Sequence, residues 1–260
     1  MKNKILLILL VLFVIPHCGI STEEHYESSN WRAGLAILVA QLIPDDAIRS
    51  RLLSNQYIIM RYAEEPAHWN NTQSHTKYLL DNILCNYYAL IDAMNQNNWT
   101  LIAMRYAVLG HYIGDCADPF NVNENISVDH LTIYEEFIDM WAEDIFGDIL
   151  EKSSTLELEE TDNITKTVND LIVKAREKYK SIIVAIDRND TALLLNYVEY
   201  LAEEATKSLY AITISAIKNS ELATSMRVLE RWRWVAIAMI FLSLIIILAS
   251  ELKKKILRRL

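Results

Sequence analysis

One short segment, GHYIGDCADPFN, combines residue types that bind metal ions. His111 and Asp115 stand four residues apart in it, each directly preceded by a glycine, Gly110 or Gly114, and Pro119 follows them. On a helix, side chains at this spacing share a face and lie about 5–6 Å apart, and imidazole and carboxylate are ordinary zinc ligands. The two glycines leave room for another helix or a ligand, and the proline ends the helix. The segment predicts a metal site, and a buried polar pair at a helix end is the alternative.

Other residues with zinc-binding side chains stand before and after this segment. The stretch AEEPAHW precedes SHTKYLLD, and HLTIYEEFID follows the segment. Their imidazoles and carboxylates are of the same types as those of His111 and Asp115, and both can bind zinc. The candidate metal-site residues in these stretches are Glu64, Glu65, His75, His130 and Glu135.

The order and spacing of these stretches resemble the signature of the zinc-dependent phospholipase C family, whose superfamily includes zinc-dependent single-strand nucleases. The resemblance covers residues 31–145. It implies an all-helical fold in which a zinc cluster hydrolyses phosphodiesters. It also implies that Glu65 or Glu64 orients or deprotonates the attacking water. The metal ligands that it implies are His75, His111, Asp115 and Glu135, with His130 displaced by one position.

The chain departs from the family pattern at two ligand positions. Asn121 stands where the family has a histidine six residues after the aspartate, and an amide is a poor zinc ligand. Leu131 occupies the position of another histidine, and His130 precedes it. On an uninterrupted helix this offset turns a side chain by about 100°. The resemblance therefore predicts one nearly complete zinc site and a second that lacks ligands.

The rest of the chain predicts an all-α multi-helix bundle that positions these residues. Only five glycines and four prolines occur in 260 residues, and the apolar residues recur at helical spacing. A first helix ends before Pro44, and the loop-like stretch 151–165 forms a surface excursion. The later helices are expected near 46–63, 75–95, 99–116, 131–150, 164–187 and 190–220.

Both termini predict export and membrane attachment. Lys2 and Lys4 precede an apolar run too short to span a bilayer, which is typical of a signal peptide over residues 1–21. Near the other end, residues 231–252 predict a transmembrane helix, and the basic residues 253–260 predict a cytoplasmic tail. Residues 22–230 then form an extracytoplasmic domain on a single-pass protein of the cell membrane.

The charge of the outer domain restricts its partners. Residues 22–230 contain 33 acidic and 16 basic residues, so binding to nucleic acid through phosphate neutralisation is not expected. A metal site can still accept a phosphodiester or phospholipid, because the ion supplies local positive charge. Cys85 and Cys116 can pair or stay free. The sequons that predict a glycoprotein are at Asn70, Asn98, Asn125, Asn163 and Asn189.

Three functions remain open from the sequence. The first is a membrane-anchored, outward-facing zinc phosphodiesterase of phospholipase C type. The second is a catalytically degenerate relative that keeps a metal for stability and serves as a surface binding module. The third is an unrelated exported helical domain without metal, in which the histidines have structural roles.

Overall fold

The structure is a computed structural model of the chain, and it confirms the all-α prediction for the part that it describes. That part contains α-helices, turns and one 3-10 helix, and no strand. The predicted signal peptide and cytoplasmic tail, the candidate metal-site residues Glu65 and His75, and more than half of the predicted transmembrane helix lie outside it. The described residues are 31–64, 78–123, 126–222, 235 and 237–245.

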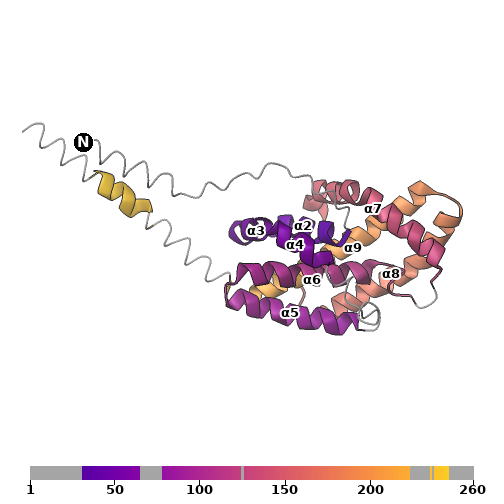
Figure 1. The fold of residues 1–260 in the computed structure, drawn as a ribbon, viewed down its shortest axis with the longest axis horizontal. Coiled ribbons are helices and arrows are strands. Elements are labelled where there is room, and N and C mark those ends of the chain that lie inside the picture. Colours follow the sequence, from indigo (N-terminus) through magenta and orange to yellow (C-terminus); the bar gives the residue numbers. More distant parts are fainter. Residues whose placement is uncertain (1–30, 65–77, 124–125, 223–234, 236, 246–260) are drawn as a thin grey trace, which may run out of the picture.

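The bundle is built around one central helix, α6. In Figure 1, α6 runs between α2 and α4 on one side and α5 on the other, and it also packs against α8 and α9. All residues from Tyr106 to Ala117 are buried, as expected for a helix surrounded by other helices. The helices are α2 (Trp31–Leu42), α3 (Asp46–Leu53), α4 (Gln56–Glu64), α5 (Leu79–Asn95), α6 (Trp99–Ala117), α7 (Val128–Glu151), α8 (Ile164–Asp187) and α9 (Thr191–Lys218), with the 3-10 helix Ser153–Thr155.

Side-chain caps set where the helices that carry the candidate site begin. The Asn98 side chain accepts a hydrogen bond from the Leu101 N–H and starts α6. Ser127 caps α7 through the N–H of His130. Such caps satisfy N–H groups that have no partner inside the helix. The same residue types at Asp45, Asn163 and Asp190 start α3, α8 and α9.

The helix predicted over 46–63 is two helices, α3 and α4. The break falls at Ser54 and Asn55, whose side chains both donate to the carbonyl of Arg51, at 2.9 and 2.8 Å. Serine and asparagine compete in this way with the helical hydrogen bonds of the backbone. The second of the two helices, α4, carries Ala63 in the last turn that the structure describes.

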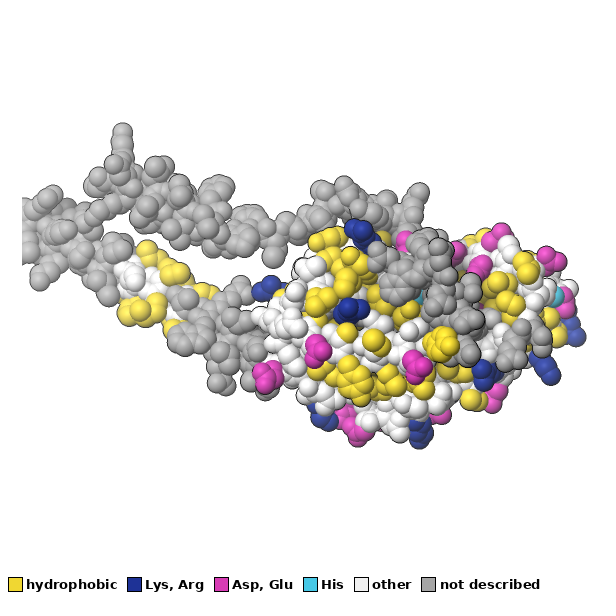
Figure 2. Space-filling model, turned by 60° about the horizontal axis from the view of Figure 1, so that its bottom comes forward, with side chains coloured by type: hydrophobic (Ala, Val, Ile, Leu, Met, Phe, Trp, Pro, Cys, Tyr) yellow, Lys and Arg dark blue, Asp and Glu magenta, His cyan; other side chains and the backbone are white. Residues whose placement is uncertain are grey.

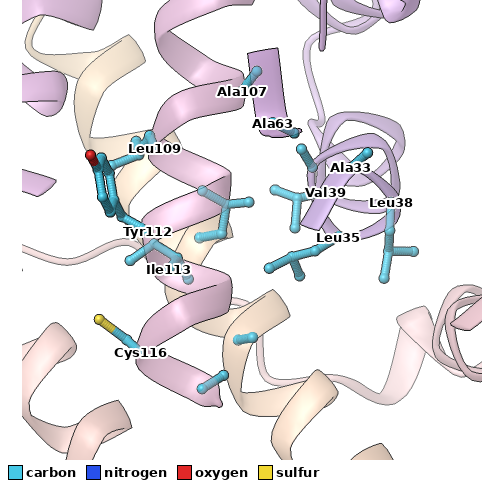
Figure 3. Close-up of a cluster of buried hydrophobic side chains, with 14 of the residues drawn as sticks. Ala33, Leu35, Leu38, Val39, Ala63, Ala107, Leu109, Tyr112, Ile113 and Cys116 are labelled. Atoms are coloured by element: carbon cyan, nitrogen blue, oxygen red, sulfur yellow. The ribbon is translucent and has the colours of Figure 1, made fainter. Parts of the chain in front are cut away.

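Glycines allow α2 to pack closely on α6 and α7. A Cβ at Gly110 would lie 3.0 Å from the Cβ of Ala36, so α2 is the helix for which Gly110 leaves room. The Tyr106 hydroxyl donates to the Ala36 carbonyl at 2.6 Å. Figure 3 shows the buried side chains of the two helices facing one another. This packing brings the first turn of α2 to the last turns of α6.

Replacing Gly34 by alanine is expected to destabilise the domain by about 1–2 kcal/mol, because overpacking costs more than helix propensity returns. The new Cβ would lie 2.6 Å from the ring of Phe146, which is buried and contacts the Trp31 ring. Gly147→Ala is the matched control, since nothing lies within 4 Å of its Cβ, and it is expected to stabilise α7 by about 0.5–1 kcal/mol. Urea unfolding of both variants measures the difference. Equal effects would contradict the close packing at Gly34.

Among the described residues, no helix combines the length and the hydropathy that a bilayer crossing requires. Residues 237–245, within the predicted transmembrane helix, are helical. Their large side chains Met239, Phe241 and Ile245 are each more than half exposed, and Figure 2 shows apolar side chains over this segment. The thiols of Cys85 and Cys116 are both free.

Candidate functional site

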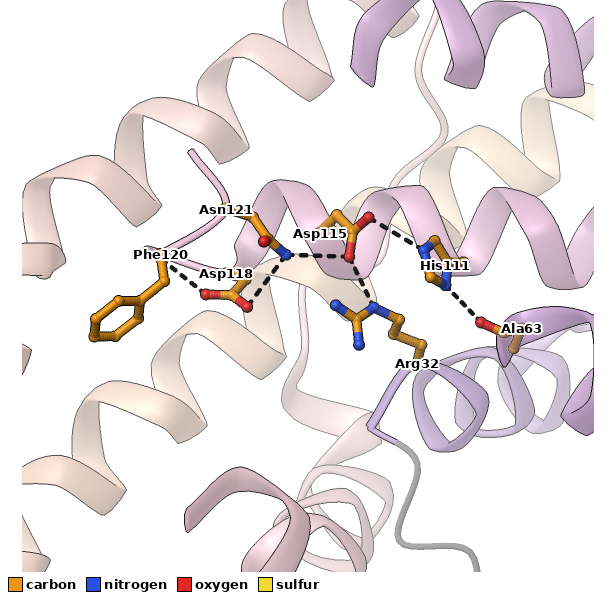
Figure 4. Close-up of polar contacts among 7 residues, drawn as sticks. All are labelled: Arg32, Ala63, His111, Asp115, Asp118, Phe120 and Asn121. Carbon is orange, nitrogen blue, oxygen red and sulfur yellow. Dashed lines mark hydrogen bonds and ion pairs between the residues drawn. The ribbon is translucent and has the colours of Figure 1, made fainter. Parts of the chain in front are cut away.

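The side chains of His111 and Asp115 lie together in the interior, as their spacing predicted. Both are 0% exposed, and His111 Nε2 lies 3.2 Å from Asp115 Oδ2. On the other side of the ring, Nδ1 lies 2.6 Å from the carbonyl oxygen of Ala63 (Figure 4). A carbonyl only accepts hydrogen bonds, so Nδ1 carries a hydrogen and donates it. Ala63 is in the last described turn of α4.

This arrangement fits two ligands of one metal ion. When Nδ1 carries the only hydrogen of a neutral imidazole, Nε2 and an ionised carboxylate oxygen are both acceptors, so either a proton or a metal cation has to lie between them. Two ligands of one tetrahedral zinc, each about 2.1 Å from the ion, stand roughly 3.4 Å apart, close to the observed 3.2 Å. A backbone carbonyl that holds the other ring nitrogen is the usual support of a histidine ligand. A second hydrogen on the ring gives the alternative, an imidazolium–carboxylate ion pair.

Arg32, which the sequence did not point to, occupies the other oxygen of Asp115. Its Nε donates to Asp115 Oδ1 at 2.7 Å, from a side chain that is 25% exposed. The side chain crosses α6 at Gly114, where a Cβ would lie 3.2 Å from Arg32 Cγ. Burial acts to lower the pKa of Arg32, but the charges of Asp115, Asp118 and Glu135 outweigh it and raise that pKa. Arg32 is therefore a permanent cation within the candidate site.

The turn after α6 directs Asn121 back to the site. The helix ends at Ala117, and the Asp118 carboxylate accepts the Phe120 N–H at 2.8 Å. The Asn121 amide then donates to Asp115 Oδ1 at 3.2 Å and to Asp118 Oδ2 at 3.3 Å (Figure 4). Asn121 thus stands beside Asp115, where the family pattern has a histidine, but its NH₂ group is a donor and cannot ligate a cation.

The predicted ligands on α7 have different surroundings. Glu135 lies close enough to Arg32 to interact with its charge. Burial raises the pKa of Glu135, and Arg32 offsets only part of that increase. His130 Nε2 instead pairs with Asp187 Oδ1 on α8 at 2.9 Å, and its Nδ1 is buried without a hydrogen-bond partner. Because α7 is an uninterrupted helix from Val128, His130 keeps the one-residue offset from the family's histidine position that the sequence predicted.

The described residues supply only part of the predicted zinc site. Within residues 31–64, 78–123 and 126–222, no three side chains of His, Cys, Asp or Glu are grouped to hold a metal ion. Glu64 ends α4, next to Ala63. A metal ion at His111 and Asp115 would therefore need ligands from outside the described part, and Glu65 and His75, which lie there, stay predictions.

Asp118→Asn is expected to stabilise the domain at pH 8 by about 2–3 kcal/mol. Burial raises the pKa of Asp118 to about 6, with Arg32 acting against it. A carboxyl whose pKa is higher in the folded than in the unfolded chain stabilises the folded state fully below the ordinary pKa of 3.8. That stabilisation is lost as the pH rises through about 6, the pKa in the folded state. Urea unfolding should show a gain at pH 8 that largely disappears at pH 4. A gain of equal size at both pH values would contradict this account.

Comparison with known proteins adds no assignment. The chain matches no known family profile, no curated protein and no solved structure.

Proposed function

We propose that this chain is a membrane-anchored, outward-facing phosphodiester hydrolase that resembles the zinc-dependent phospholipases C. The observation that carries the proposal is the orientation of His111. The Ala63 carbonyl fixes the hydrogen on Nδ1 at 2.6 Å, and Nε2 faces Asp115 Oδ2 at 3.2 Å. This arrangement is the one expected of two zinc ligands of which the histidine is supported by a backbone carbonyl.

The side chains around the pair support the same proposal. Zinc, when bound, polarises a phosphoryl oxygen and lowers the pKa of water. His111 and Asp115 would hold it in the interior, where the low dielectric strengthens electrostatic interactions. Glu64, which ends α4, or Glu65, the next residue in the sequence, is proposed to accept the proton of the attacking water. His75 is proposed as a further ligand.

The C-terminal segment supports a location at a membrane. Residues 237–245 form a helix with exposed apolar side chains, and basic residues follow from Lys253 to Arg259. Basic residues beyond an apolar helix favour the cytoplasmic side. The catalytic domain then faces the opposite side, near the headgroups of the membrane.

Turnover of a chromogenic phosphodiester tests the proposal. The full chain, purified in detergent with zinc, is expected to hydrolyse p-nitrophenylphosphocholine or bis(p-nitrophenyl) phosphate. His111→Ala is expected to lower the rate at least about 100-fold, because the nucleophilic water loses its activating ion. Gly34→Ala is the control for lost stability, since the atoms nearest to a Cβ at Gly34 belong to the Phe146 ring and not to His111 or Asp115. Turnover that survives in His111→Ala or in chelator would overturn the proposal.

A non-catalytic binding module stabilised by a metal is the second candidate. The Asn121 amide, which donates to Asp115 and Asp118, favours it. A second ion would require an acceptor at that position, and phosphodiester hydrolysis often uses two ions. A chain that retains zinc and turns over neither ester would establish this candidate instead.

A further inference from the structure

Two helices of the bundle begin at asparagines that belong to Asn-X-Thr sequons. Asn98 caps α6 and Asn163 caps α8. Each side-chain oxygen accepts a backbone N–H, that of Leu101 at 3.2 Å or that of Lys166 at 2.9 Å. Both asparagines are exposed. Because the cap uses only Oδ1, the helices do not need Nδ2, the atom to which an N-linked glycan is attached.

Capping alone does not explain the residues chosen at these two positions. Asp45 and Asp190 cap α3 and α9 in the same way, and a carboxylate adds a favourable negative charge at the helix N-terminus. Asn98 and Asn163 lack that charge. A threonine stands two positions after each of these asparagines, whereas an alanine stands two positions after each aspartate cap. The pairing of asparagine with threonine is what N-glycosylation requires.

Both capping asparagines lie where the chain leaves the bundle after α9. The Glu221 N–H, just beyond that helix, donates to the Asn95 side chain in the corner between α5 and α6 at 2.9 Å. Lys218, the last residue of α9, pairs with Glu160 in the segment before α8 at 2.6 Å. Each sequon begins three residues after one of these contacts. The ends of α9, the start of α6 and the start of α8 therefore meet at one end of the bundle.

The third sequon within the described residues has another explanation. Asn189 lies in the corner between α8 and α9 at φ 53°, a left-handed conformation in which asparagine is enriched. It stands at the far end of α8 from Asn163, and a helix of 24 residues is about 36 Å long. The turn alone accounts for an asparagine there.

We infer that Asn98 and Asn163 are N-glycosylation sites, with glycans that flank the exit of the chain toward its C-terminal segment. This inference rests on the outward location in the proposed function. The transfer joins Nδ2 to C1 of the first sugar of a lipid-linked oligosaccharide diphosphate. The C1–O bond to the diphosphate breaks, the lipid diphosphate leaves with the bonding electrons, and Nδ2 gives up one proton. The amide keeps Oδ1, so each helix keeps its cap.

Site-resolved mass spectrometry tests the inference. The full chain, made in a eukaryotic secretory host, is treated in heavy-oxygen water with an N-glycosidase that converts each glycosylated asparagine to a labelled aspartate. Label is expected at both Asn98 and Asn163. Thr100→Ala leaves the Asn98 cap in place and is expected to lose the glycan at Asn98 alone. Thr100→Ser keeps the hydroxyl of the sequon, so it is the matched control and is expected to retain that glycan.

Aspartate variants separate glycosylation from folding. Asn98→Asp and Asn163→Asp keep an oxygen for the cap but have no acceptor nitrogen. Each is expected to lose one glycan and to keep the helical circular dichroism of the wild type. Loss of the helical signal in these variants, or label at Asn98 that persists in Thr100→Ala, would contradict the inference.

The outcomes also distinguish this inference from the proposed function. A membrane-impermeant biotin reagent on intact cells shows whether the domain faces outward. An outward-facing chain without label at Asn98 or at Asn163 overturns the inference and leaves the hydrolase in place. A chain that carries both glycans and turns over neither phosphodiester overturns the hydrolase and supports the inference. A chain that the reagent does not reach, without glycans, overturns the outward location on which both rest.

Discussion

Asp115→Asn is expected to destabilise the domain by about 3–5 kcal/mol, the cost of breaking a buried charge pair by removing one partner. Asp115 is 0% exposed and contacts His111 and Arg32 through its two oxygens. Asparagine keeps the shape but loses the negative charge. It leaves the Arg32 guanidinium without its nearest counter-charge, and it removes one ligand from the candidate metal site. Urea unfolding of the full chain at pH 7 measures the change.

Asp118→Asn is the matched comparison, because an effect of the opposite sign is expected for it. The same substitution three residues further along removes a carboxylate whose pKa burial raises, so it is expected to stabilise at that pH. The two variants change the net charge equally. Destabilisation by less than about 1 kcal/mol in Asp115→Asn, or the same sign in both variants, would contradict the roles given to the two carboxylates.

Removing the metal is the second change with a large expected effect. A ligand present at about 1,000 times its Kd stabilises a folded protein by about 4 kcal/mol. For a domain of this size, each kcal/mol corresponds to roughly 2–4 °C in Tm. A chelator is therefore expected to lower the midpoint of thermal unfolding by about 8–16 °C. Circular dichroism at the helical minimum follows this transition.

His111→Ala is the matched control for chelation. The variant lacks one ligand of the pair, so its Tm should already be low and should not change further in chelator. Zinc returned to the stripped wild type should restore the original midpoint. A wild-type Tm that is the same with and without chelator would support the imidazolium–carboxylate ion pair instead.

The sequence predicted the helices well where local signals decide their limits. Apolar spacing and a cap at Asn98 define α6, which was expected over 99–116 and ends at Ala117. For α8, the same signals gave the end at Asp187. The break at Ser54 and Asn55 was missed, because it depends on side-chain hydrogen bonds to one carbonyl, which apolar periodicity does not reveal.

The candidate site was predictable only along a single helix. The contact between His111 and Asp115 follows from the helical repeat. Arg32 is 83 residues from Asp115, and its position depends on how α2 crosses α6 at two glycines. Gly110 and Gly114 indicated a close neighbour, but their spacing does not say whether that neighbour is a ligand or a helix. The partner of His130, Asp187 on α8, likewise depends on tertiary packing.

Zinc content measured by elemental mass spectrometry tests the central claim most directly. The full chain, refolded with zinc and dialysed, should retain one zinc per molecule, and His111→Ala treated in the same way should retain none. A folded wild type that emerges without zinc would contradict the account, because His111 and Asp115 would then be joined by a shared hydrogen and not by a metal ion.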